Sequence, residues 1–165
     1  MTAPSTLSIT AASPADVPLI LSLISELAEY EKLSHEAVAT EASLQESLFG
    51  ANPGAEALIA RVDGEPAGFA LFFHNFSTFL GRRGLYLEDL FVRPSFRGRA
   101  IGKSLLIHLA ALALERGCGR FEWQVLDWNT PAREFYERLG AKANPVWINY
   151  RMTGEALERL AAALP

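Results

Sequence analysis

A basic stretch rich in small residues is the first part of the chain whose residue types suggest chemistry. A hydrophobic run leads into a helix-like pattern through Phe91-Val92-Arg93-Pro94-Ser95-Phe96-Arg97-Gly98-Arg99-Ala100-Ile101-Gly102-Lys103-Ser104. Free amides at a helix start, glycines that permit close approach and arginine charges together suit a phosphate or pyrophosphate group. The stretch is not a nucleotide P-loop, because Gly98 and Gly102 enclose three residues, one fewer than that motif requires. The alternative is a glycine-containing helix cap with solvated arginines.

Two adjacent carboxylates, Glu88 and Asp89, interrupt an otherwise apolar run over 85–92. Neighbouring side chains of a strand point to opposite faces, so at least one carboxylate of a central strand should face a helix layer or a gap. Burying it without a partner costs several kcal/mol and raises its pKa, which favours a general base. An ion-paired or edge carboxylate is the alternative.

A third motif joins a predicted strand to a short helix over 127–140. Asn129 or Thr130 would cap this helix, with Pro131 at or near its first position. Tyr136 follows the core-spaced Phe135 on a different side of the helix. By itself a tyrosine at this position is more often a packing residue with one satisfied hydroxyl than a catalyst.

The elements that must position these motifs follow from hydrophobic periodicity. Alternation predicts strands over 7–11, 57–62, 67–73, 85–92, 121–126 and 146–152, with Asp63-Gly64 as a hairpin turn. Helical spacing predicts helices from Pro14 to about Leu33, from Thr40 to Gly50, and over 98–115, 131–139 and 155–164. An antiparallel run of strands followed by strands joined through helices predicts an α/β (α+β) three-layer fold, a mixed central sheet with helices on both faces.

Composition indicates a single folded globular domain. Its 165 residues, half of them apolar and 21% charged, predict one folded domain over 1–165. Fifteen Lys and Arg against nineteen Asp and Glu leave a net charge of −4, which argues against nucleic-acid or anionic-membrane partners. Small cationic partners are favoured instead.

Cysteine and histidine usage indicates a reducing compartment and no metal site. The lone Cys118 excludes an internal disulfide framework, and histidines at 35, 74 and 108 lack metal-ligand spacing. No basic n-region precedes a hydrophobic run, and the most apolar stretch, 105–114, contains His108 and is shorter than a bilayer span. We therefore expect a cytoplasmic protein with no export signal and no membrane span.

The three motifs, in this order, resemble the GNAT superfamily of acetyl-CoA-dependent N-acetyltransferases over nearly the whole chain. The stretch from Arg97 to Gly102 matches the pyrophosphate loop of that family, Q/R-x-x-G-x-G/A, with Ala100 where the pattern has Gly. A helical backbone at the end of the loop would tolerate this alanine. Within the superfamily, segments 26–33, 86–89 and 129–136 are similar to the diamine acetyltransferases, the spermidine/spermine type and its thialysine-acetylating relatives.

The resemblance implies the GNAT-like acyl-CoA N-acyltransferase fold, acetyl-CoA as co-substrate, no metal, and a homodimer. It implies Tyr136 as general acid and Glu88 as a base acting through water. The implied donor contacts are Leu90, Phe91, Val92, Arg97, Gly98, Arg99, Ala100, Ile101, Gly102, Lys103, Asn129, Thr130, Pro131 and Ala132. The implied acceptor contacts are Tyr30, Glu31, Glu88, Glu122, Trp123 and Gln124.

The expected reaction is direct acetyl transfer to the primary amine of a small cationic acceptor, a thialysine- or lysine-like amino acid or a diamine. An alkyl ammonium, with a pKa near ~10.4, must first lose a proton to a carboxylate or water. Ser77 and Asn144 stand where the polyamine-acetylating relatives carry acidic residues, so we expect short acceptors to outperform spermine. The alternatives are acetylation of a protein lysine or N-terminus, and a catalytically idle acyl-CoA-binding module.

Overall fold

The computed structural model describes residues 5–163, and the chain forms two compact units, Met1–Gln124 and Val125–Pro165. The first unit is built on a five-stranded sheet in the order β1-β2-β3-β4-β5. Its strands are β1 (Leu7–Ala11), β2 (Glu56–Val62), β3 (Glu65–Ser77), β4 (Arg82–Val92) and β5 (Phe121–Trp123). Neighbours from β1 to β4 are antiparallel and β5 is parallel to β4, which confirms the predicted mixed sheet.

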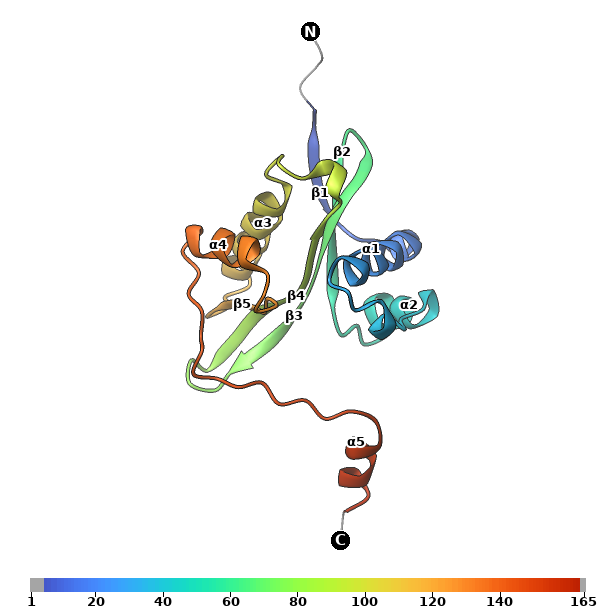
Figure 1. The fold of residues 1–165 in the computed structure, drawn as a ribbon, viewed down its shortest axis with the longest axis vertical. Coiled ribbons are helices and arrows are strands. Elements are labelled where there is room, and N and C mark those ends of the chain that lie inside the picture. Colours follow the sequence, from blue (N-terminus) through green and yellow to red (C-terminus); the bar gives the residue numbers. More distant parts are fainter. Residues whose placement is uncertain (1–4, 164–165) are drawn as a thin grey trace. The chain divides into compact units, whose positions relative to one another are not determined.

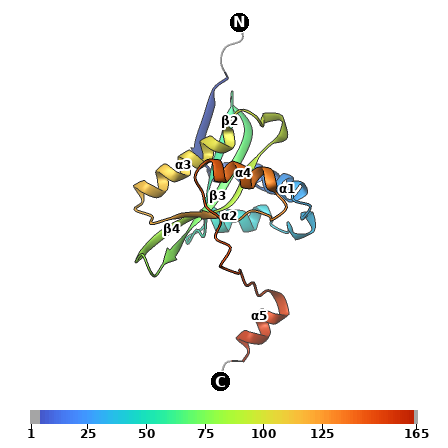
Figure 2. The same ribbon diagram turned by 60° about the vertical axis from the view of Figure 1, so that its left-hand side comes forward.

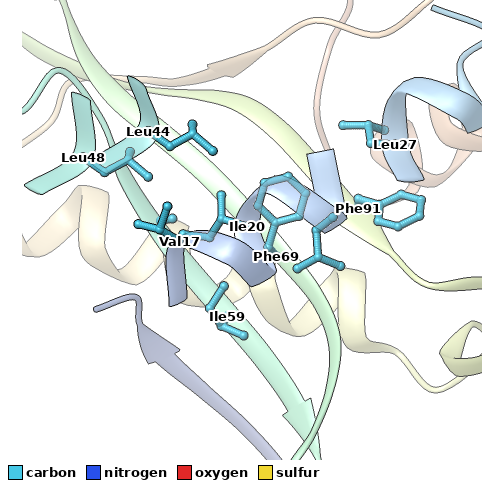
Figure 3. Close-up of a cluster of buried hydrophobic side chains, with 10 residues drawn as sticks. Val17, Ile20, Leu27, Leu44, Leu48, Ile59, Phe69 and Phe91 are labelled. Carbon is cyan, nitrogen blue, oxygen red and sulfur yellow. The ribbon is translucent and has the colours of Figure 1, made fainter. Parts of the chain in front are cut away.

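Helices cover both faces of this sheet (Figure 1). On one face, α1 (Val17–Tyr30) and α2 (Glu41–Phe49) pack their apolar sides onto the strands, and α3 (Ile101–Glu115) covers the other. Figure 3 shows leucine, isoleucine and valine side chains of the two N-terminal helices pointing toward Ile59, Phe69 and Phe91 of the sheet. The three-layer prediction is confirmed for this unit.

The first long helix ends earlier than the sequence pattern predicts. It stops at Tyr30 instead of about Leu33, because Lys32 takes a left-handed conformation with φ of 62°. The Leu33 N–H donates to the Ala28 carbonyl at 2.8 Å and the Lys32 N–H to the Glu29 carbonyl at 3.1 Å, a Schellman-type end. The chain therefore turns immediately after Tyr30.

The hairpins follow the predicted turns, and one extends further than expected. Asp63 and Gly64 both have positive φ, 52° and 86°, as a two-residue type I′ turn between β2 and β3 requires. The strands β3 and β4 are longer than the apolar runs that predicted them. Their hairpin therefore extends past α1 and α2 (Figures 1 and 2). Thus the two helices cover only part of the β3–β4 surface.

The helix α3 begins at Ile101, three residues after the predicted start at Gly98. Gly98 and Ala100 have φ of 77° and 58°, values that a right-handed helix does not contain. The expectation that Ala100 lies in helical backbone is therefore wrong. The short 3-10 turns η1 (Pro14–Asp16), η2 (Ser34–Glu36) and η3 (Pro94–Phe96) complete the first unit.

The second unit contains α4 (Thr130–Arg138) and α5 (Gly154–Ala161), close to the predicted helices; Leu164, the predicted end of the last one, lies outside the described residues. Two strand predictions are wrong: β5 stops at Trp123 instead of 126, and 146–152 forms no strand. Alternation marks a segment that can pair, but a strand also needs a ladder partner, which periodicity does not supply. Among the residues that the structure describes, no helix is long and apolar enough to cross a membrane.

Candidate functional site

A β-bulge in β4 re-aims the two adjacent carboxylates. In the β3–β4 register, Leu87 pairs with Phe72 and Asp89 pairs with Leu71, so Glu88 is one residue too many. A bulge disrupts the alternation of side chains and often lies beside an active site. The simple opposite-face argument for the Glu88-Asp89 pair therefore fails, although the strand itself is where the sequence predicts it.

The raised pKa predicted for this pair belongs to Asp89. Burial, together with the negative charges of Glu88 and Glu31, raises the pKa of Asp89 to about 6. Glu88 is exposed, and its role as base stays a prediction. Since the charge of Glu31 acts on Asp89, the end of α1 and the bulge of β4 form one acidic cluster, Glu31, Glu88 and Asp89.

Tyr30 and Glu31, predicted acceptor contacts, lie at the end of α1. Burial raises the pKa of Glu31. The guanidinium of Arg97 lies 4.7 Å from the ring centroid of Tyr30 and 5.8 Å from that of Phe91. The Arg97 Nε–H also donates to the Val92 carbonyl at 3.0 Å. An acceptor residue and a donor-loop residue, predicted separately, are thus in direct contact.

The loop before α3 presents unpaired amides to an anion. The first helical hydrogen bond runs from the Ser104 N–H to the Ala100 carbonyl at 2.9 Å. The amides of Ile101, Gly102 and Lys103 therefore have no acceptor within the helix. The sequence over 93–104 contains arginines and a lysine but no carboxylate. The loop fits a phosphate-bearing group by geometry as well as by charge.

The free edge of β4 lies next to this loop. Because β5 pairs only with 85–87, the edge of β4 over 88–92 that faces away from β3 has no strand partner in the part of the chain that the structure describes. Gly102 packs against this segment: a Cβ there would lie 3.8 Å from Val92 Cγ2 and 4.0 Å from Leu90 Cδ2. The predicted donor contacts Leu90, Phe91 and Val92 thus adjoin the amides at the start of α3.

Arg93, which sequence reasoning did not select, anchors the start of the loop. Its Nη2 lies 2.7 Å from Glu26 Oε1 and its Nε lies 2.9 Å from Glu26 Oε2. Its Nη1 donates to the Pro66 carbonyl at 3.0 Å. The hydrogen bonds from Arg93 hold the pKa of Glu26 below its ordinary value, and together with the Pro66 contact they join α1, β3 and the loop.

Glu122, a predicted acceptor contact, is already ion-paired. The Arg120 Nε lies 2.7 Å from Glu122 Oε2, and the Asn75 amide donates to the same oxygen at 2.9 Å. Trp123 follows on β5, and Gln124 ends the first unit. Arg120 and Glu122 are two residues apart in the sequence, and this close spacing of opposite charges is the signal that indicates the pair.

Ser77 has a structural task at the far end of the hairpin. Its side chain is buried, and its hydroxyl accepts the Leu80 N–H at 3.2 Å, closing the turn between β3 and β4. It therefore offers no charge to an acceptor. Asn144, in the second unit, lies outside the helices.

In the second unit, the predicted cap and the predicted acid lie on one helix. Asn129 Oδ1 accepts the Ala132 N–H at 3.4 Å, so Asn129 caps α4, Thr130 is its first residue and Pro131 lies in its first turn. The rings of Phe135 and Tyr136 are 5.4 Å apart between centroids. The residues assigned from the resemblance over 129–136 thus share one capped helix.

No group of three or more His, Cys, Asp or Glu side chains that could hold a metal ion occurs among residues 5–163.

Comparison with known proteins gives consistent matches across both units. The Acetyltransferase (GNAT) family model matches residues 21–141. A thialysine N-epsilon-acetyltransferase from Sus scrofa is 40% identical over 161 residues, covering 91% of this chain and 94% of the relative. An L-ornithine N5-acetyltransferase from Arabidopsis thaliana is 33% identical, covering 90% of this chain and 85% of the relative. A solved integron cassette protein from the V. cholerae mobile metagenome has 28% identity and a TM-score of 0.81, covering 95% of this chain and 98% of that one.

Proposed function

The chain belongs to the acetyltransferase (GNAT) family and is an N-acetyltransferase, and from that premise we propose that it acetylates the side-chain amine of a small cationic amino acid. The family implies acetyl-CoA as the donor. The observation that carries the proposal is the acidic cluster of Glu31, Glu88 and Asp89 at the bulge of β4. Carboxylates gathered in one place suit an ammonium group. The names of the relatives, which acetylate thialysine and ornithine, support the same acceptor class.

The donor fits residues that the sequence analysis selected. Acetyl-CoA supplies the acetyl group as a thioester and carries a pyrophosphate and an amide-bearing arm. The amides and positive charges over 97–103 would hold the pyrophosphate, and the free edge of β4 at Leu90, Phe91 and Val92 would bind the arm. Asn129, Thr130, Pro131 and Ala132 would provide further contacts from α4.

One side chain would accept a proton during the reaction and another would donate one. Glu88, exposed at the bulge, would accept a proton from the acceptor ammonium through water. Asp89, with a pKa of about 6, is largely ionised at pH 7.5 and adds a second carboxylate to attract the ammonium. The Tyr136 phenol would give its proton to the departing sulfur. Orientation of amine and thioester supplies much of the remaining rate advantage, so no covalent enzyme intermediate is needed.

An acceptor panel tests the proposal. The full-length protein is assayed by thiol release with acetyl-CoA and thialysine, lysine, ornithine, putrescine, spermidine or spermine, and with a lysine-containing peptide. We expect the amino acids to have the highest kcat/KM. A higher kcat/KM for spermine would show that the acidic surface has been misplaced, and turnover of the peptide alone would favour the protein-acetylating alternative.

Domain organisation, oligomeric state and cellular location are further parts of the proposal. A single domain over 1–165 is supported by the family match, since 21–141 runs through both compact units. A homodimer and a cytoplasmic location rest on the resemblance and on composition. Light scattering of the purified protein would test the homodimer, for which we expect a mass of about 36 kDa, twice that of the 18.1 kDa chain.

A further inference from the structure

Glu122, the middle residue of β5, is a carboxylate that already has a cation. Arg120 Nε lies 2.7 Å from Glu122 Oε2, and the two side chains are 37% and 39% exposed. Arg120 Nη2 also reaches the Phe76 carbonyl at 3.4 Å. The Asn75 amide donates to the same Glu122 oxygen at 2.9 Å, so the carboxylate is held from two sides yet stays within reach of solvent.

The fold makes room for this pairing. Gly84 on β4 lies where a Cβ would come within 2.3 Å of Asn75 Oδ1 and 3.0 Å of Arg120 Cγ. A larger residue would push both partners away from Glu122. The Asn75 Oδ1 is buried against this glycine with no hydrogen-bond partner among the described residues. Turning the amide over would bring that oxygen against the Glu122 carboxylate, so the nitrogen faces Glu122.

Glu122 shares its surroundings with the carboxylate predicted to act as base. In the β4–β5 register Glu122 is the partner of Tyr86, and Tyr86 lies two residues before Glu88 on β4. Burial and the negative charges of both Glu88 and Glu122 raise the pKa of Tyr86. A cation bound at the bulge would therefore have Glu122 as a neighbour, but one whose charge Arg120 cancels.

Resting on the proposed function, we infer that Arg120 sets acceptor selectivity by neutralising Glu122, so that acceptors with a second, distal ammonium find no free carboxylate on β5. A short acceptor needs only the acidic cluster of Glu31, Glu88 and Asp89. A diamine that extends along the strands toward β5 meets the Arg120–Glu122 pair, and its second ammonium is left partly desolvated and unpaired. Selectivity against such acceptors arises from this absence of a counter-charge.

The test compares two acceptors that differ in one ammonium, pentylamine and 1,5-diaminopentane. Their kcat/KM ratio is measured by competition in wild type, Arg120→Gln, Glu122→Gln and the double variant. We expect Arg120→Gln to raise the diamine-to-monoamine ratio about fivefold, because one charge at this range is worth about that factor. Glu122→Gln leaves Arg120 uncompensated and should lower the ratio. The double variant, which has neither charge, should return to within about twofold of wild type.

Controls separate selectivity from folding. Arg83→Gln removes an exposed arginine of β4 whose charge acts on His74, and it should leave the ratio unchanged. Partly exposed ion pairs contribute little to stability, so Arg120→Gln should fold. Circular dichroism melting checks this. Arg120→Met, which keeps the aliphatic stem, replaces Arg120→Gln if the latter is unstable.

The outcomes distinguish the two proposals. If wild type acetylates thialysine but the two single variants change the ratio in the same direction, or not at all, Arg120 does not set selectivity and only this inference fails. A purely structural role of the pair would lower kcat/KM for both acceptors in all three variants. If wild type acetylates none of the amines in the panel, the proposed function fails and this inference fails with it.

Discussion

Tyr136 is the residue on which the departure of the thiolate would depend. A free phenol has a pKa of about 10 and a free thiol one of roughly 8.5, so a phenol held against the sulfur can supply a proton as the thiolate leaves. We expect Tyr136→Phe to lower kcat about 100-fold while the Kd of acetyl-CoA changes by less than about twofold. Single-turnover kinetics with calorimetric Kd values measure both. Phe135→Leu, beside it on α4, is the packing control, and an unchanged kcat in Tyr136→Phe would return this tyrosine to a packing role.

Glu88, exposed at the bulge, is predicted to remove the ammonium proton. Glu88→Gln should reduce kcat/KM most at neutral pH, where free amine is scarce, and recover partly toward pH 9 as the acceptor loses its own proton. The measurement is a pH–rate profile of the variant against wild type. A profile of unchanged shape would mean that Glu88 is not the base and would direct attention to Asp89.

Ionisation of Asp89 lowers the free energy of unfolding as the pH rises. Its pKa of about 6 lies above the ordinary 3.8, so the native protein holds this proton more tightly than the unfolded chain does. Stability from this group is therefore lost as pH rises from about 4 to about 6, and the ionised form costs on the order of 3 kcal/mol at pH 8. The unfolding free energy of Asp89→Asn minus that of wild type should therefore be larger at pH 8 than at pH 4, by up to that amount.

Urea unfolding at the two pH values measures this difference for Asp89→Asn. Glu65→Gln, an exposed carboxylate at the start of β3, controls for the loss of one negative charge. A stability difference between Asp89→Asn and wild type that is the same at both pH values would contradict the assignment.

At the scale of elements, the loop before α3 holds a strained alanine. Ala100 has φ of 58°, a left-handed conformation in which an L side chain is disfavoured by about 1–2 kcal/mol and glycine is not. Ala100→Gly should therefore stabilise the protein by about 1 kcal/mol, offset in part by the greater freedom of glycine in the unfolded chain. Chemical denaturation measures the change. Ala110→Gly, at an exposed position inside α3, is the matched control and should destabilise by about 1 kcal/mol.

An ion pair and a cation–π contact link α1 to this loop. Glu26 binds Arg93 at the start of the loop, and the Tyr30 ring lies under Arg97 further along it. The helix that carries the acceptor residues is thereby tied to the element that would hold the donor. A sequence pattern finds the helix and the loop separately, because residues 67 positions apart show no periodicity relative to each other.

At the scale of the whole molecule, charges of opposite sign lie on neighbouring elements: an acidic cluster at the end of α1 and the bulge, and a basic loop before α3 whose Arg97 contacts Tyr30. The net charge of −4 attracts a cationic acceptor over distances comparable to the Debye length, about 10 Å at 0.1 M salt and about 3 Å at 1 M. We expect the KM of lysine to rise about 3- to 10-fold between 0.1 and 1 M NaCl. Steady-state kinetics with sucrose at equal osmolarity as the control would check it. A KM independent of salt would argue against electrostatic recognition of the acceptor.

Local physics in the chain itself determined most of the elements and the candidate motifs. The Asp63-Gly64 turn, the helix start at Thr40, the cap at Asn129 or Thr130 and the α3 apolar stripe depend on residues a few positions apart, so their patterns predicted them closely. The family resemblance likewise rests on short contiguous motifs. The matches to known proteins confirm it.

Tertiary structure alone decided which charges are free to act. The bulge at Glu88 depends on the register with β3, and it assigned the raised pKa to Asp89. The hydrogen bond from Asn75 to Glu122 joins residues 47 positions apart, and the left-handed Ala100 lies in the loop that joins β4 and η3 to α3. Burial, pairing and register are properties of contacts between distant segments, and a one-dimensional pattern records only which residues could make them.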